Sequence, residues 1–435
     1  MKMTIWRRRL ARVLGGLALT IGTTGMAGSW AADPPAAEAP AAVTTVNLAT
    51  ALNNAYERQP ALAAARASLA AAETSLRTLQ NMPSGASLLI HDLEIRKKQA
   101  CLGRSAAHGA LIQAEAETTY AVTRTYLSVL YARAQLKVTI DVVGNLGFYQ
   151  KQVSAGVKEG KGNREWTQST VDKITIYLRL AETKQAEAER GVGRATAALK
   201  EAIGLDPCVP LAVADDTLPE RIVDVSRNDV LCLALSRRGE MIQASAAAQV
   251  VCLEADAQGR HACPGVQRTF AAVADIHANQ VPQGTRNGDY RPGAFGIEMP
   301  SFLAGSRNDR VHRAQDLADR ASAVADKARN LVGLDAEDTF LKWQESMRKL
   351  TTTRSAAESG KGLSEDTMKD FRADQKVKIE DILGNEVLSA QARSAHNEAL
   401  YWLNISLADL ERVTAGGFCA GLTQPPPVEK IGPPK

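Results

Sequence analysis

The chain contains an internal repeat whose two copies differ in length. The leucine- and alanine-rich pattern around Arg58 recurs around Arg238, 180 residues later. Further along, Gly103-Arg104-Ser105 lines up with Gly305-Ser306-Arg307 about 202 residues later, and Gly160-Lys161-Gly162 recurs as Gly360-Lys361-Gly362, 200 residues later. The second copy therefore holds roughly 22 extra residues after its first helix, which is about what two membrane-crossing strands need. A duplication on this scale predicts one object with two pseudo-equivalent halves.

Long stretches with few helix breakers predict an elongated, mainly α fold. Aromatic residues make up only 5% of the chain, and a thick globular core would require more. If residues 103–160 are helical, they span roughly 85 Å. Two apolar stripes run along this segment, one with Tyr120 and Leu127 and the other with Val122 and Tyr126. Two stripes predict packing on two neighbours, so we expect duplicated long antiparallel helical hairpins that form the wall of a ring or bundle.

The first residues have the features of a secretory signal. Five basic residues precede a short apolar stretch, and Ser29-Trp30-Ala31 offers small residues for cleavage. Loss of these five positive charges changes the formal net charge from +4 to −1, so no nucleic-acid partner is predicted. The expected parts of the chain are a signal peptide (1–31), a disordered Ala/Pro-rich linker (32–47), a first helical repeat (48–206), a connector (207–227), a second helical repeat (228–414) and a disordered Pro-rich tail (415–435).

The second copy is expected to repeat the plan of the first. Its opening helix is predicted from Val230 to about Ala257, and its long helix from about Arg307 to Ala357. A turn is then expected at Gly360-Lys361-Gly362, followed by a final helix from Glu365 to Val413. In the first copy, Pro60 is expected to kink or restart the opening helix.

Between Cys263 and Gly305 the hydrophobic period changes from 3.6 to 2, which predicts a β-hairpin over residues 268–304. One apolar and one polar face is what a strand between lipid and a wet lumen requires, and each run is near bilayer-crossing length. A soluble hairpin packed on a helical body produces the same alternation, so both interpretations stay open. The residues expected to face the membrane are Phe270, Ala272, Ala274, Ile276, Phe295, Ile297 and Met299.

Several classes of site find no support in the sequence. No nucleophile elbow, P-loop or zinc motif is present, so neither an enzyme nor a cofactor is predicted. After the leader there is no apolar run long enough for a membrane helix, so membrane insertion would have to use strands. The six cysteines are expected to be small buried residues. A Cys252–Cys263 disulfide and a metal site at this pair are the alternatives.

The order and spacing of the repeats resemble those of the TolC-like outer-membrane efflux proteins. The resemblance covers most of residues 48–414, and no single segment carries it. The matching segments are the helix openings Ala51–Ala65 and Ala234–Ala244, the helical run Glu115–Val122, the closing Ala202-Ile203-Gly204-Leu205, and the second strand with its descent, Tyr290–Gly305.

This resemblance implies the outer-membrane exit duct of a tripartite efflux or type I secretion system, a passive conduit with a periplasmic helical portion. It implies a homotrimer in which each chain gives four long helical segments and four membrane strands. It also implies that the helix turns meet a periplasmic adaptor protein of an inner-membrane pump. The alternative is a non-conducting periplasmic scaffold derived from such channels. The turn residues expected to dock the adaptor are Gly160, Lys161, Gly162, Gly360, Lys361, Gly362, Leu363 and Ser364.

One feature departs from this pattern. Residues 81–86 have the composition of a turn and residues 87–99 continue in helical order, so the first copy is expected to contain little or no hairpin. With one hairpin per chain, a trimer would supply half of the implied strands. Either residues 81–103 contain a short hairpin, or the assembly differs from that of the resembled family.

Overall fold

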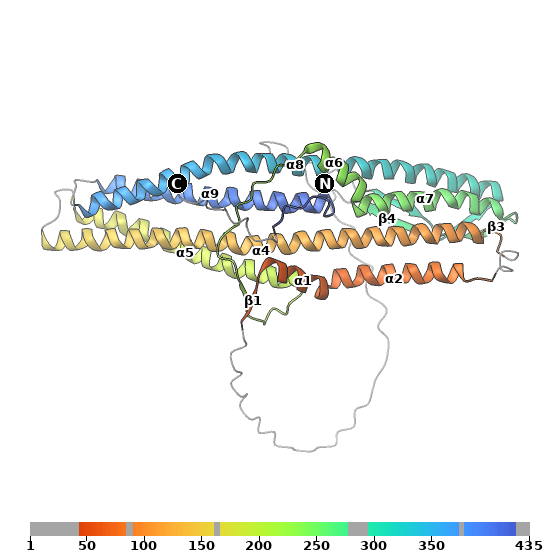
Figure 1. The fold of residues 1–435 in the computed structure, drawn as a ribbon, viewed down its shortest axis with the longest axis horizontal. Helices are drawn as coiled ribbons and strands as arrows, with labels where there is room; N and C mark the ends of the chain where they lie inside the picture. The colour runs from red at the N-terminus through yellow and green to blue at the C-terminus, as the bar shows by residue number, and fades with distance from the viewer. Residues whose placement is uncertain (1–42, 84–89, 161–165, 277–294, 374–377, 423–435) are drawn as a thin grey trace, which may run out of the picture. The chain divides into compact units, whose positions relative to one another are not determined.

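Two very long helices, α4 (Leu93–Glu159) and α8 (Arg307–Arg372), run through the two halves of the chain (Figure 1). The computed structural model describes residues 43–83, 90–160, 166–276, 295–373 and 378–422. The expected signal peptide, most of the linker and the end of the tail lie outside these residues.

The other helices are α1 (Leu48–Arg58), α2 (Pro60–Gln80), α5 (Gln168–Ile203), α6 (Arg227–Arg237), α7 (Gly239–Arg260) and α9 (Ile379–Val413). The strands are β1 (Thr44–Val46), β2 (Leu211–Val213), β3 (Gly265–Arg268), β4 (Ala272–Ile276), β5 (Phe295–Met299) and β6 (Phe302–Gly305).

Each half forms a long antiparallel helical hairpin. The chain returns from α4 as α5 and from α8 as α9, and the two helices of each pair pack along one another (Figure 1). Helix α4 also contacts α2, α7 and α9, so it has the several neighbours that its two apolar stripes predicted. The expected mainly α fold of duplicated helical hairpins is therefore confirmed.

The largest apolar cluster lies where the two halves meet. Tyr126 and Leu127 of α4 are each 1% exposed, and they belong to one cluster with Ile203 at the end of α5 and Leu403 of α9. A short parallel pair, β1 with β2, borders this cluster and ties the start of the first repeat to the connector. Residues from both predicted stripes of α4 are thus used in the core.

Both copies interrupt their opening helix at an equivalent position. Gln59 and Arg238 have extended backbones, with ψ of 119° and 136°. Pro60 predicted the first break, but the second was not expected, because the sequence indicated one continuous helix there. The second break places Gly239 against α4, where a Cβ on Gly239 would lie 2.0 Å from the carbonyl oxygen of Gly109. Only glycine allows this approach of the two backbones.

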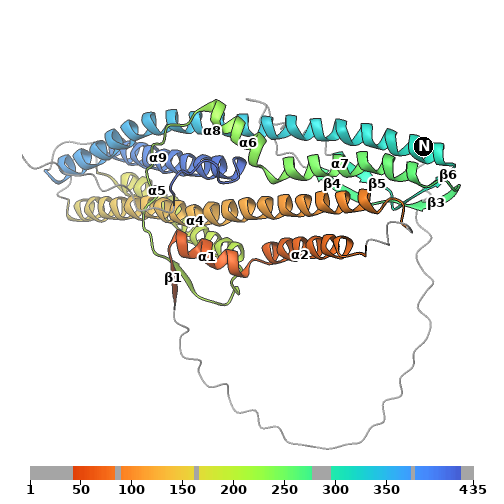
Figure 2. The same ribbon diagram turned by 45° about the vertical axis from the view of Figure 1, so that its right-hand side comes forward.

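The hairpin predicted in the second copy is present, and it bends. β3 pairs with β6 and β4 pairs with β5, both antiparallel. Figures 1 and 2 show β3 at the end of the helices and β4 lying back along α7, which it contacts. In the first copy, the described residues between α2 and α4 (81–83 and 90–92) contain no strand.

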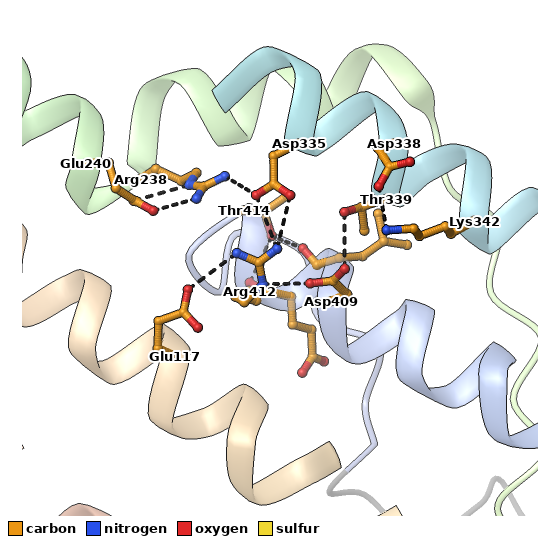
Figure 3. Close-up of polar contacts among 12 residues, drawn as sticks. Glu117, Arg238, Glu240, Asp335, Asp338, Thr339, Lys342, Asp409, Arg412 and Thr414 are labelled. Carbon is orange, nitrogen blue, oxygen red and sulfur yellow. Dashed lines mark hydrogen bonds and ion pairs between the residues drawn. The ribbon is translucent and has the colours of Figure 1, made fainter. Parts of the chain in front are cut away.

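A buried group of charged residues, the polar junction, joins four helices beside the central cluster (Figure 3). Arg412 of α9 has a side chain 5% exposed, and it donates to Asp409 at 2.6 Å and to Asp335 of α8 at 3.2 Å. It also lies 3.4 Å from Glu117 of α4. Arg238, which precedes α7, donates to the same Asp335 at 2.6 Å. Helices α4, α7, α8 and α9 are therefore linked through one set of ion pairs.

The polar junction holds its charges across the physiological pH range. Burial lowers the pKa of Arg412, but the negative charges of Asp409, Asp335 and Glu117 raise it more, so the pKa lies above its ordinary value. The Tyr120 ring centre is 5.6 Å from the guanidinium carbon of Arg412. Burial and the nearby charge of Asp409 raise the pKa of Tyr120 to about 12. Arg412 therefore stays charged and Tyr120 stays neutral.

Replacement of Arg412 by Met is expected to destabilise the protein by about 3 kcal/mol, because it removes the cation from the largely buried Asp409 and one arginine from Asp335. Arg227→Met is the matched control. Arg227 pairs with Glu337 at 2.7 Å, but its side chain is 55% exposed, so its loss should cost less than about 1 kcal/mol. Urea unfolding monitored by circular dichroism measures both variants. Equal shifts of the two midpoints would contradict the assigned role of the polar junction.

Replacement of Gly239 by Ala should cost about 1–3 kcal/mol, because the added methyl forces α4 and α7 apart. Gly259→Ala on the same helix is the control. There the nearest atom to a Cβ is 3.8 Å away, so higher helix propensity should stabilise α7 by up to about 1 kcal/mol. Thermal melting of the two variants should show shifts of opposite sign. A lower melting temperature for both would refute the glycine contact.

Candidate functional site

The first helix hairpin turns where the sequence indicated. Gly160 follows the end of α4 in the left-handed conformation, with φ of 62°, and a Cβ there would meet nothing within 4 Å. Its role in the chain is thus conformational, as at many helix ends. Helix α5 then begins after Thr167, which accepts a hydrogen bond from the Thr170 backbone N–H. Lys161 and Gly162 lie outside the described residues.

The second turn lies further along the chain than predicted. Helix α8 continues without a break to Arg372, and the chain turns between Ala373 and Lys378. The final helix therefore begins 14 residues after its predicted start at Glu365, at Ile379. The residues that were expected to form this turn, and that instead lie within α8, are Gly360, Lys361, Gly362, Leu363 and Ser364.

Gly360 has a packing role that explains the error. A Cβ at this position would lie 3.2 Å from the Cβ of Ala392 and 3.2 Å from the Cα of Ser389, both on α9. The glycine therefore lets the two backbones approach closely within the α8–α9 pair. A glycine that serves packing and a glycine that ends a helix look alike in a single sequence.

Polar contacts join the two helix hairpins in the half of the molecule that carries the turns. Asp141 of α4 forms an ion pair with Arg393 of α9. Close by, Gln135 of α4 donates to the carbonyl oxygen of Ser394 at 3.1 Å, and the Ser394 hydroxyl donates back to Gln135 at 2.9 Å. We call these contacts, together with those of the next paragraph, the hairpin links.

Glu386 of α9 connects three helices nearer the turns. Its carboxylate is 2% exposed and accepts from Asn145 of α4 at 3.2 Å and from the Ser364 hydroxyl of α8 at 2.8 Å. Beyond it, Lys173 of α5 pairs with Glu380 of α9 at 2.7 Å. That outer pair is more than half exposed, so it contributes little to stability. The outermost of the hairpin links is therefore the weakest.

Aromatic rings pack close to the turns, beside the outermost hairpin link. Tyr149 of α4 is fully buried, and its ring centre lies 5.0 Å from that of Phe371 near the end of α8. Trp166, just before α5, stacks on Phe371 at 5.9 Å. Burial and the charge of Glu386 raise the pKa of Tyr149 above its ordinary value. These rings and the links were not singled out by the sequence, because each side chain taken alone fits an ordinary helix face.

At the opposite end, the β5 strand faces inward. Ile297 and Met299 are 1% and 2% exposed, and they pack in a cluster with Ala248 of α7 and Ala321 of α8. Glu298, between them, is exposed. The alternation was predicted correctly, but these two side chains face the helices of their own chain, which contradicts the expectation that they face the membrane. For Ile297 and Met299, the structure agrees with the alternative interpretation, a hairpin packed on the helical body.

Phe270 also turns toward the helices. Its backbone N–H donates to Glu254 of α7 at 3.1 Å, and its half-buried ring lies against Gly103 of α4. The other expected membrane-facing residues lie in β4 or at the start of β5, and the directions of their side chains lie outside what the structure describes. For these residues the orientation stays a prediction: Ala272, Ala274, Ile276 and Phe295.

A buried polar group fixes the root of the hairpin to the helices. Glu254 is 0% exposed and pairs with Arg96 of α4 at 2.5 Å. Arg310 of α8, also 0% exposed, donates to the carbonyl oxygens of His261 at 2.7 Å and Gly305 at 2.8 Å. The sequence did not indicate this group. The sequence feature that could have indicated it is Glu254, a charged residue within the apolar face of α7.

The cysteines differ from what the sequence predicted. All six cysteines are exposed and unpaired, so the expectation of buried cysteines and the alternative Cys252–Cys263 bridge are both wrong. Among the described residues, no group of three or more His, Cys, Asp or Glu side chains could hold a metal ion. In the same part of the chain, no helix combines the length and apolarity needed to cross a membrane.

Comparison with known proteins identifies the fold. No family model matches the sequence, and no curated protein sequence matches it. Solved structures do match. The outer-membrane channel OprN has a TM-score of 0.67 at 14% identity, over 85% of this chain and 90% of that chain. VceC from Vibrio cholerae has 0.63 at 14% identity, over 85% and 96%. The open-state channel MtrE of Neisseria gonorrhoeae has 0.63 at 15%, over 85% and 89%. The chain therefore has the fold of TolC-like outer-membrane efflux channels.

Proposed function

We propose that this protein is the outer-membrane exit-duct subunit of a tripartite efflux or type I secretion system. The observation that carries the proposal is the match of duplicated long helical hairpins, over more than four fifths of the chain, to solved outer-membrane channels. In this function the protein is a passive conduit and not an enzyme. Energy for transport would come from a partner pump.

The proposal includes a homotrimer and a periplasmic adaptor of an inner-membrane pump. The first docking point on the adaptor is the turn that starts at Gly160, with Lys161 and Gly162. The second is the turn between Ala373 and Lys378, in place of residues 360–364. A left-handed glycine supports this role at the first turn, because it lets the backbone turn tightly and approach a partner closely.

The hairpin links provide a physical basis for a gate. If the duct opens by separation of the two helix hairpins near their turns, the Asp141–Arg393 pair and the Asn145–Glu386 hydrogen bond must break. The partly exposed pairs Asp141–Arg393 and Lys173–Glu380 contribute about 0.2–1 kcal/mol each, whereas the buried hydrogen bond of Glu386 costs more to break. Such an arrangement opens when a partner supplies a few kcal/mol of binding energy.

Ion conductance across planar lipid bilayers tests the proposed conduit. The purified mature protein should give discrete conductance steps after reconstitution. Carbonate-washed membranes from the producing cells should retain the protein, as expected for a protein held in the outer membrane. Reconstituted protein that stays in the bilayer without conductance steps would refute the conduit.

The non-conducting scaffold is the second candidate, and one observation favours it. Ile297 and Met299 are buried against α7 and α8, so these apolar side chains serve the helical body in this arrangement. The same bilayer recording separates the two functions. A scaffold gives no conductance with any of the variants below.

Replacement of Arg393 by Ala is expected to raise the open probability of the conduit by about two- to fivefold, because one link worth up to about 1 kcal/mol is lost. Lys184→Ala is the matched control. Lys184 pairs with Glu187 within α5, and this pair joins no other helix. Single-channel recording measures both variants. A gate held by the links is contradicted if the two variants conduct alike.

A further inference from the structure

A cavity of about 580 Å³ lies beside the polar junction, where the end of α9 meets the start of α7. Arg412, which Figure 3 shows within the junction, forms part of its wall. Helix α1 contributes Tyr56 and helix α4 contributes Tyr120, and both rings are half-buried. A cavity of this volume lies within the range of ligand-binding pockets. None of the hairpin links uses a residue of this wall, so the proposed gate leaves the cavity without a role.

The segment after α9 folds back and forms one side of the cavity. Ala415, with φ of 47°, reverses the chain directly after the helix. The Phe418 N–H then donates to the Thr414 hydroxyl at 3.0 Å, and the half-buried Phe418 ring lines the cavity. The Ala420 N–H donates to the Glu411 carboxylate at 2.6 Å. The chain is therefore fixed beside the cavity just before its C-terminal tail begins.

The tail is rich in proline and starts close to the cavity. Leu422, which is 8% exposed, is the last described residue, and residues 423–435 follow it. The run Pro425-Pro426-Pro427 comes early in this tail. Pro425 is six residues beyond Cys419, which lines the cavity. The proline run therefore begins within about 20 Å of the cavity wall, even along a fully extended chain.

The wall has the chemistry that binds proline-rich segments. Consecutive prolines favour the polyproline II conformation, which costs little entropy to order, and grooves lined by aromatic rings bind such segments. The cavity supplies three rings, those of Tyr56, Tyr120 and Phe418. The Tyr56 hydroxyl forms a hydrogen bond with the Thr119 hydroxyl at 2.7 Å, which holds its ring in place.

Charges of both signs on the wall match charges on the tail. Glu115 is half-buried and Arg237 is exposed, and both line the cavity. A Cβ at Gly417 would lie 2.9 Å from the Nη1 atom of Arg237, so this guanidinium packs closely on the segment after α9. In the tail, Glu429 and Lys430 follow soon after the proline run. Opposite charges at such a contact fix the direction of a bound segment.

The short connection favours the protein's own tail over a separate partner. A segment joined by a short linker has an effective concentration of about mM at its site. A proline-rich segment from another protein would have to exceed this concentration, or bind more tightly, to displace it. The occupant that the connection favours is therefore residues 423–435 of the same chain.

We propose that the cavity is a docking site for the proline-rich tail, and that Pro425, Pro426 and Pro427 pack on the rings of Tyr56, Tyr120 and Phe418. The docked tail covers the side of the polar junction that faces the cavity. This proposal does not rest on the proposed function, because no step of it requires conduction or a partner pump.

A spin label on the tail tests the docking. The six exposed cysteines of the full mature chain are replaced by serine, Val428→Cys is introduced, and a nitroxide is attached to it. Electron paramagnetic resonance should show a restricted component for this label. Ala116→Phe should reduce the restricted fraction at least about threefold, because Ala116 lines the cavity and the added ring fills it.

Ala121→Phe is the matched control for this substitution. Ala121 lies on the same helix, is exposed and does not line the cavity, so the label should stay restricted. Circular dichroism and melting should show that both variants fold. An equal restricted fraction in the unchanged chain and in Ala116→Phe overturns the proposal. An equal loss in Ala121→Phe also overturns it, because the effect would not come from the cavity.

Alkylation of Cys419 tests the prolines without a change in the folded body. In a chain that keeps Cys419 as its single cysteine, replacement of Pro425, Pro426 and Pro427 by Gly should speed the reaction with a maleimide at least about threefold, because the more flexible tail leaves the cavity. A chain that keeps only Cys263, beyond the far end of α7, should react at an unchanged rate. An unchanged rate at Cys419 contradicts the proposal, and so does an equal increase at Cys263.

A mixing experiment separates the protein's own tail from that of a second copy. Spin-labelled chains with Ala116→Phe are mixed with an excess of unlabelled chains whose three prolines are replaced by Gly, which leaves the cavity of the unlabelled chains open. The label should stay mobile if each tail docks on its own chain. Return of the restricted component would show that the tail enters the cavity of another copy, and docking within one chain would then be wrong.

Discussion

The desolvation of Arg412 is the constraint on which the arrangement of the helices depends. A buried guanidinium must find all of its partners, and these come from α4, α8 and α9, while Arg238 before α7 shares Asp335. A slip of one turn, about 5.4 Å, of α8 along α9 would separate Arg412 from Asp335 and leave buried charge without its partner, at a cost of several kcal/mol. The polar junction therefore fixes the register of helices more than 60 residues long, whose apolar contacts alone would tolerate sliding.

The sequence predicted the features that depend on local chemistry. Scarce helix breakers predicted the long helices, and Gly160 predicted the first turn, because a left-handed residue at a helix end favours glycine. The features that it did not predict depend on distant neighbours. Gly360 lies in mid-helix because α9 packs on it, and α6 ends at Arg237 without a proline because Gly239 must fit against Gly109. The sequence of one segment does not indicate which residue of another helix will pack against it.

The strands show the same difference between features that depend on local sequence and features that depend on distant neighbours. Alternation of apolar and polar residues predicts that one face of a strand is dry, and Ile297, Glu298 and Met299 follow it in the structure. Alternation does not indicate what excludes water from that face, lipid or protein. Lipid and an alanine-lined pair of helices are equally apolar. The partner of this apolar face is the pair α7 and α8, because the small side chains of these helices leave room for a strand to pack on them.

Burial differs between the two ends of the molecule, and this difference determines which end can move. At the hairpin root, Glu254 and Arg310 are fully buried and hold the backbone of the strands, so separation there would expose unpaired charges and carbonyl groups. At the turns, Lys173 and Glu380 are already in water and lose little when they part. A long helix pair that is fixed at its centre and root, and whose outermost polar pair is exposed, concentrates motion at its outermost turn. In the proposed conduit, the position of a gate would follow from this solvent exposure, without any feature that was built for movement.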